Sequence, residues 1–118
     1  VLMAQSAVID IIGATATTTV GIIPANSQIV DVILNVTTVN NDGGTATVQV
    51  GNAGDTDEYL PATNVKALAT TRGTIQTEGT DIGTSDQTVT ATFTAANGDG
   101  TTGAATVTVL YMQNNNLS

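Results

Sequence analysis

Residues 85–94 read SDQTVTATFT, and this stretch decides the fold class. Val89, Ala91 and Phe93 alternate with four threonines. Successive side chains of a β-strand point to opposite faces of a sheet, so strict alternation of apolar and polar residues indicates a strand with one buried and one solvated face. The stretch therefore predicts a half-buried strand with Phe93 in the core.

The same composition continues outward from this stretch. Threonine makes up about a fifth of the chain and, with valine and isoleucine, dominates the periodic segments. These residue types favour pleated strands over helices. Turn-forming residues separate the segments, as in NNDGGT (40–45) and ANGDGTTG (96–103).

The pattern predicts an all-β fold, an antiparallel sandwich or barrel of about eight strands. The expected strands are approximately residues 6–12, 15–23, 28–38, 45–51, 64–69, 73–78, 87–95 and 104–112. One segment stays open between two interpretations: ATNVKAL, after Pro61, fits either one helical turn or a short edge strand.

The predicted core is thin. Of the 118 residues, 41% are hydrophobic, but they include one Phe, two Tyr and no Trp. Small domains with thin cores are commonly supplemented by disulfides, metals or oligomerisation. The chain has no Cys, which leaves a metal or further subunits, and which suits folding in a reducing cytosol.

Two strands carry apolar residues on faces that alternation assigns to solvent. In QIVDVILNV (28–36), Ile29 and Ile33 fall on the outer face, and in GAATVTVLYM (103–112), Leu110 and Met112 end the outer row. The inner row expected for the first of these strands is Val30, Val32, Leu34 and Val36. Because the core is already short of large side chains, we expect a neighbouring subunit to cover the four outer residues as an oligomer interface.

Charge excludes several partners. The net charge is −8, and Lys66 and Arg72 are the two basic residues. Nucleic-acid affinity depends on several cations that neutralise phosphates and release counterions, so we expect no nucleic-acid binding. Anionic membrane surfaces are disfavoured for the same reason. The apolar runs are far shorter than the ~20 residues that span a bilayer, so we expect a soluble protein with no membrane partner.

Enzymatic chemistry lacks its usual residues. Without His and Cys, a serine nucleophile has only Lys66 as a conceivable base. A glycosidase could draw two carboxylates from Asp55, Glu58 and Glu78, but few aromatic rings are present for sugars to stack on. The glycines lie in turns and not between a strand and a helix, as a phosphate-binding loop requires. We expect no enzyme and no cofactor.

An acidic loop lies in GNAGDTDEYLPATNV (51–65), where Asp55, Asp57 and Glu58 fall within four positions. Such oxygen ligands suit Ca²⁺, although the spacing does not match an EF-hand loop. The alternative is a solvated loop that supports solubility and discourages unwanted edge pairing. The solvated loop is the interpretation we adopt, with calcium as the alternative.

Four segments together resemble a known group of proteins. They are TTTVGIIPANSQIVDVILNVTT (17–38), GGTATVQVGNAGDTDEYLPATNV (43–65), GTSDQTVTATFTA (83–95) and GAATVTVLYM (103–112). The pattern resembles the small β-sandwich virion structural proteins of tailed bacteriophages, which include head decoration (cement) proteins. The resemblance covers residues 15–112 and lies in fold-maintaining motifs.

The resemblance implies a jelly-roll-like domain that associates with itself, often as a trimer, and binds the major capsid protein on the outer surface of the capsid. It would assemble in the host cytoplasm. The chain would divide into an N-terminal arm and first strand (1–14), one β-sandwich domain (15–112) and a flexible tail (113–118). Residues 1–7 would be an arm that lies on the shell or on a neighbouring subunit. The alternative for these residues is a disordered terminus. Tyr59 and Leu60 would tuck under the acidic loop. The alternative is a tail-fibre, spike or adhesin module that binds a host receptor.

Overall fold

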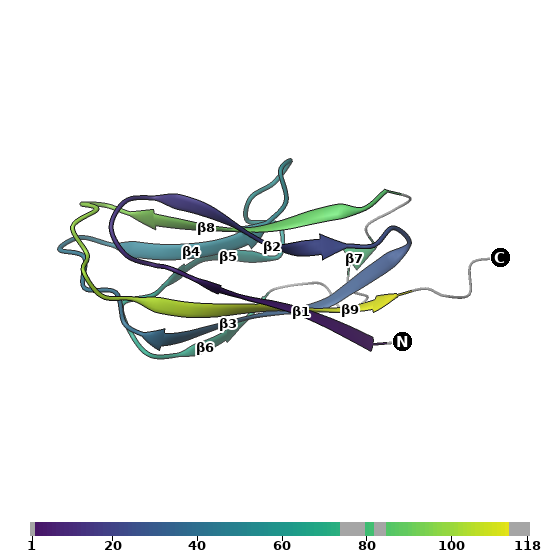
Figure 1. Cartoon of the computed structure of the whole chain (residues 1–118), viewed down its shortest axis with the longest axis horizontal. Coiled ribbons are helices and arrows are strands. Elements are labelled where there is room, and N and C mark those ends of the chain that lie inside the picture. Colours follow the sequence, from purple (N-terminus) through teal and green to yellow (C-terminus); the bar gives the residue numbers. More distant parts are fainter. Residues whose placement is uncertain (1, 74–79, 82–84, 114–118) are drawn as a thin grey trace.

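The computed structural model describes residues 2–73, 80–81 and 85–113. They form two antiparallel sheets packed face to face (Figure 1), and no helix occurs among them. The all-β sandwich that the alternating segments predict is therefore confirmed.

Each sheet combines strands from distant parts of the chain. The first, here the β1 sheet, has the order β1-β9-β3-β6, with β7 also paired to β3. The second, here the β2 sheet, has the order β2-β8-β4-β5. The β1 sheet contains β1 (Leu2–Ile9), β3 (Ser27–Thr38), β6 (Thr70–Arg72), β7 (Thr80–Asp81) and β9 (Ala104–Gln113), and the β2 sheet contains β2 (Ala16–Ile23), β4 (Ala46–Gly51), β5 (Leu60–Asn64) and β8 (Gln87–Ala95).

The strand pairs show how the chain is wound. β4 pairs with β5, β3 with β6, β2 with β8 and β1 with β9, as in one long antiparallel ribbon that turns back between β4 and β5. Successive pairs of this ribbon alternate between the two sheets. Each sheet therefore contains two of these four pairs.

The core lies between the sheets and is filled mainly by aliphatic side chains. Phe93 is 3% exposed, and its neighbours Val89 and Ala91 on β8 are also buried. The inward row of β9 is buried as alternation predicts and consists of Ala105, Val107, Val109 and Tyr111. The period of two is therefore correct for these two strands along their whole length.

In β3 the alternation is broken by a bulge. Ile29 faces Tyr111 and Asp31 faces Leu110, so the register shifts at Val30. One extra residue in a strand moves the following side chains to the opposite face. Ile29 is consequently buried together with Val32, at 0% exposure each, and Val30 is only half-buried. The prediction of Ile29 as an interface residue, and of Val30 as a core residue, is wrong.

The N-terminal segment is a strand and not an arm. β1 pairs with β9 without interruption from Leu2 opposite Met112 to Ile9 opposite Ala105. Ile9 and Ile11 are buried in the core between the sheets. Because this strand completes the β1 sheet within its own chain, the interpretation of residues 2–7 as an arm or a disordered terminus is corrected.

The middle of the chain also differs from the expected strands. Leu60–Asn64 forms β5 at the edge of the β2 sheet, a position in which a strand tolerates proline such as Pro61. The edge-strand interpretation of the segment after Pro61 is thus correct, and the expected strand 64–69 is wrong beyond Asn64. Gly73, the one described residue of the expected strand 73–78, lies in no strand, and residues 74–78 and the tail after Gln113 lie outside the described residues.

Candidate functional site

The acidic loop between β4 and β5 is organised by backbone turns. The Asn52 side-chain oxygen accepts hydrogen bonds from the amides of Gly54 and Asp55, both at 2.9 Å. The Asp55 carbonyl accepts from the amides of Asn52 (2.9 Å) and Glu58 (3.3 Å). The loop closes over Tyr59 and Leu60, which are 2% and 1% exposed. The expectation that these two residues tuck under the loop is confirmed.

The loop carboxylates affect one another's protonation. A side-chain hydrogen bond with Asp57 lowers the pKa of Asp55, and the same contact raises the pKa of Asp57. Hydrogen bonding to Asp55 also raises the pKa of Glu58, with smaller contributions from burial and charge repulsion. Within the described ranges no group of three acidic side chains is arranged to hold a metal ion. The geometry fits a solvated acidic turn better than a calcium site.

The strongest polar site is Asp42, which lies in the NNDGGT turn at residues 40–45. Its Oδ1 accepts hydrogen bonds from the amides of Gly44 (2.7 Å) and Asn97 (3.3 Å), and its Oδ2 from those of Gly98 (2.7 Å) and Asp99 (3.2 Å). The Gly44 amide is the largest of the effects that lower the pKa of Asp42. Asp42 therefore joins the 40–45 and 96–103 turns, and its role is structural.

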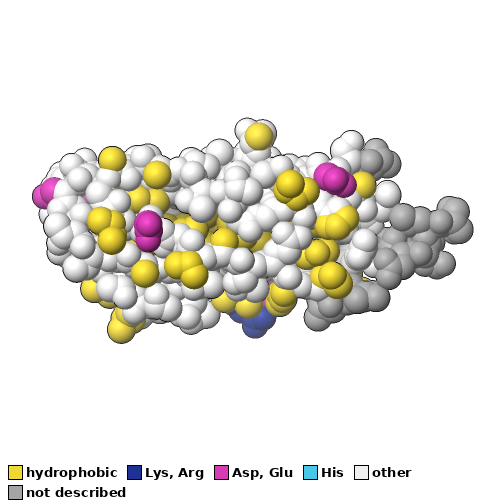
Figure 2. All heavy atoms as spheres, in the orientation of Figure 1, with side chains coloured by type: hydrophobic (Ala, Val, Ile, Leu, Met, Phe, Trp, Pro, Cys, Tyr) yellow, Lys and Arg dark blue, Asp and Glu magenta, His cyan; other side chains and the backbone are white. Residues whose placement is uncertain are grey.

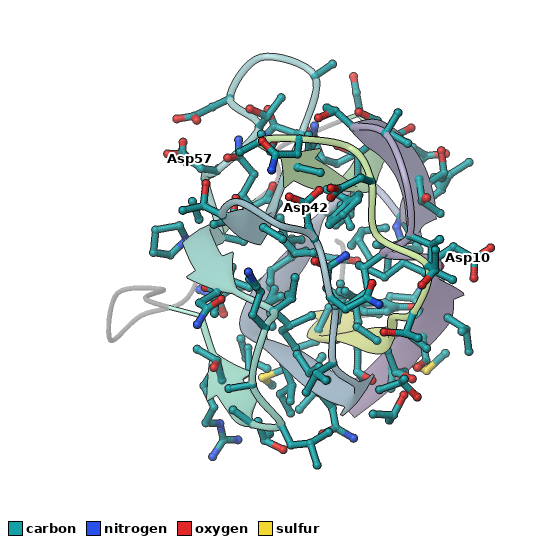
Figure 3. All side chains as sticks on the ribbon, turned by 90° about the vertical axis from the view of Figure 1, so that its left-hand side faces the viewer. Asp10, Asp42 and Asp57 are labelled. Carbon is teal, nitrogen blue, oxygen red and sulfur yellow. The ribbon has the colours of Figure 1, made fainter. Side chains whose placement is uncertain are left out.

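The labelled acidic residues do not converge. In Figure 3, which looks along the sandwich from the end that carries the 40–45 and 96–103 turns, Asp42 lies near the middle of the view, while Asp57 and Asp10 lie apart at opposite sides. The amine of Lys66 donates to the carbonyls of Asp42 (2.6 Å) and Gly44 (2.7 Å). Lys66 thus braces the same turn and is not positioned as a base for a serine nucleophile in the part of the chain that the structure describes.

The outer face of the β1 sheet carries three of the four predicted interface residues. Met112 is 47% exposed, and Ile33 and Leu110 are half-buried. Ile33 lies opposite Arg72 in the register, and Arg72 forms an ion pair with Asp31 at 2.6 Å. The face therefore combines apolar side chains with one neutralised charge pair.

Sequence reasoning missed a second apolar region. Met3 (39% exposed), Val8 (73%), Ile12 (44%) and Ile22 (54%) lie on β1, on the β1–β2 connection or on β2. We call these four residues the edge residues. The available signal was the uncharged run LMAQSAVI (2–9), but it was divided between an arm and a strand beginning at residue 6.

No helix among the described residues is long and apolar enough to cross a membrane.

Comparisons with known proteins find the fold but no family. No protein-family model matches the chain, and no curated protein sequence matches it. A chain of the structure described as the acidic stable capsid structure of Helicobacter pylori bacteriophage KHP30 is 19% identical, with a TM-score of 0.73 and coverage of 95% of this chain and 87% of that chain.

Two further solved structures show the same likeness. A chain of the cyanophage Pam1 capsid asymmetric unit is 20% identical, with a TM-score of 0.67 over 96% of this chain and 84% of its own length. A chain of the capsid of Ralstonia phage GP4 is also 20% identical, with a TM-score of 0.63 over 96% and 83%. At these identities the likeness establishes a shared fold over almost the entire chain.

Proposed function

We propose that this protein is a non-enzymatic virion structural protein, and specifically a head decoration (cement) protein on the outer surface of a phage capsid. The observation that carries the proposal is the fold: it matches, over 95–96% of the chain, chains found in three phage capsid structures. Fold alone does not determine function, so the surface of the molecule has to fit the role as well.

The charge distribution fits a position outside the shell. With a net charge of −8 and two basic residues, the chain has no surface suited to the packaged nucleic acid. Its acidic turn at residues 55–58 is exposed and stands clear of the β-sheets, where it would keep particles apart by repulsion. A reinforcing protein in this place needs association surfaces and no catalytic group.

The partners of such a protein are further copies of itself and the major capsid protein. We assign one association surface to the outer face of the β1 sheet, where Met112 is exposed and Ile33 and Leu110 are only half-buried by the chain itself. Covering these side chains in the particle would add apolar burial to a thin core. The resemblance to decoration proteins implies three copies in each assembly.

Quantitative protein analysis of purified virions tests the function. A decoration protein should be present in hundreds of copies per particle and should be released before the shell is disrupted. A few copies that co-purify with isolated tails would contradict the proposal and favour a receptor-binding module. Ile33→Asp should fold normally but fail to attach to particles, and Thr94→Asp, on the outer face of β8, serves as its matched control.

A further inference from the structure

The free edge of β1 is unlike the other edges of the sandwich. β1 is eight residues long, carries no charged residue and no proline, and pairs with β9 in a continuous register. No strand lies on its other side among the described residues. Figure 1 views the sandwich from this side, with β1 and β2 nearest to the viewer. Long, flat, uncharged edges readily pair with another chain.

The remaining edges carry the features that usually prevent such pairing. β2 has a bulge between Thr19 and Gly21. β5 contains Pro61, and β6 has three residues ending in Arg72. Bulges, prolines, charges and short strands all discourage strand addition. Only β1, among the edges described, lacks every one of these features.

The side chains beside this edge are also incompletely covered. Met3 belongs to the inward row of β1 yet is 39% exposed, and Ile22 on the neighbouring β2 is 54% exposed. The amide of Gln5 donates to the Ile22 carbonyl at 2.7 Å and holds the two strands together. Figure 2 shows this side of the molecule with hydrophobic side chains spread along it and few acidic ones. A strand added to β1 would cover Met3, which lies on that strand.

We propose that β1 pairs antiparallel with β1 of a second copy about a two-fold axis, so that the β1 sheet continues through both molecules. The strand suits pairing with itself: larger apolar residues flank a centre of small or uncharged ones, Ala4 to Ala7. A two-fold contact uses the same strip on both partners. Because the two β1 strands run antiparallel, Met3 of one copy lies beside the C-terminal half of β1 in the other copy.

Charge also favours a second copy at this edge. Two molecules of net charge −8 repel one another, and the repulsion is least where acidic groups are absent. β1 has none, and the first acidic residue after it is Asp10. The pairing would therefore form with little electrostatic cost.

This inference rests on the proposed function and names a surface through which copies associate, with two copies joined at β1 in place of the three that the resemblance implies. A two-fold contact closes on two copies, whereas the three copies that the resemblance implies need a head-to-tail contact. The mass in solution separates the two arrangements. We expect light scattering and sedimentation to give twice the chain mass of 11.8 kDa.

Disulfide trapping locates the contact, because the chain has no cysteine of its own. Ala4 and Ser6 are exposed on the outward row of β1. In an antiparallel two-fold pair, outward residues of one strand face outward residues of the other. Depending on the register, Ser6 then faces Ser6 of the second copy, or Ala4 faces Ser6 of the second copy. Cysteines at facing positions would be close enough for a disulfide. We expect rapid covalent dimers from Ser6→Cys or from the double variant Ala4→Cys/Ser6→Cys. Thr94→Cys, on the outer face of β8, is the control and should form no covalent dimer under the same mild oxidation.

A charge-repulsion variant tests the same contact without a covalent bond. Ala4→Lys/Ser6→Lys should weaken dimerisation at least tenfold and change the melting temperature of the monomer little, while Thr92→Lys/Thr94→Lys should leave dimerisation intact. A monomeric wild type, a trimer, or an assembly that neither cross-links through β1 nor responds to the lysines would overturn the inference. None of these results alters the copy number per virion, which tests the proposed function separately.

Discussion

The Asp42 carboxylate is the residue on which one end of the sandwich depends. Four backbone amides from two turns donate to it, and buried amides that lose their acceptor destabilise a fold. The pKa of Asp42 is lowered, so its protonation is linked to unfolding.

Acid should therefore weaken the protein partly through Asp42. A carboxyl group with a lowered pKa in the folded state contributes stability that is complete above its unfolded pKa of about 3.9 and is lost as the pH falls through the folded value. Asp42→Asn should lower the melting temperature at pH 7 and flatten its decline below about pH 4. Thermal melts between pH 7 and pH 2 measure this, with the exposed Asp10→Asn as control. Equal pH slopes for the wild type and Asp42→Asn would disprove the role.

The acidic turn allows a second test at this scale. Asp57 and Glu58 have raised pKa values because Asp55 lies beside them, and the three side chains are not arranged as a metal site. We expect the melting temperature to be the same in 5 mM CaCl₂ and in EDTA, to within about 1 °C, since a bound ion would stabilise by mass action. A calcium-dependent rise that Asp55→Asn abolishes would restore the calcium alternative.

The bulge in β3 shows what alternation can and cannot predict for an element. Alternation gave the correct inward rows of β8 and β9, because a period of two holds wherever a strand pairs in continuous register. It failed in β3, where one additional residue at Val30 inverts the assignment of everything before it. The sequence IVDV contains no glycine or proline to mark such a bulge, so its position depends on the partner strand and cannot be predicted from local pattern.

The edge of β1 was missed for a related reason. Its partner is β9, and Leu2 pairs with Met112 across almost the whole chain. Nothing within residues 2–9 indicates so distant a partner. The interface prediction therefore fell on outer-row residues of strands that were recognised, and the least protected edge of the fold was taken for an arm.

The bulge makes two isoleucines of one strand respond differently to the same substitution. Ile29→Asp should cost at least about 4 kcal/mol, because it places an unpaired charge at a site that is 0% exposed. Ile33→Asp should cost less than about 1 kcal/mol, because the half-buried outer site lies opposite Arg72. Urea denaturation of both variants measures the difference. Equal losses would mean that Ile29 is not in the core.

At the scale of the whole molecule, the last strand, β9, connects the strands of the β1 sheet. β9 lies between β1 and β3 and brings four buried side chains to the core, those of Ala105, Val107, Val109 and Tyr111. Among the described residues β1 pairs with no other strand, and β3 has only the short β6 and β7 on its other side. Because these pairings join distant parts of the chain, their loop-closure entropy has to be offset before any of them is stable. The sandwich should therefore fold as one cooperative unit.

Truncation tests this cooperativity. A chain ending at Gly103 lacks β9 and should be unfolded throughout, although the β2 sheet retains all its strands, because one sheet without the other leaves its apolar face in water. A chain ending at Gln113 keeps every described strand and should unfold at the wild-type temperature. Far-ultraviolet circular dichroism and urea titration distinguish the two. A cooperative transition in the shorter chain would show that the β2 sheet is stable alone. The core would then not depend on side chains from both sheets.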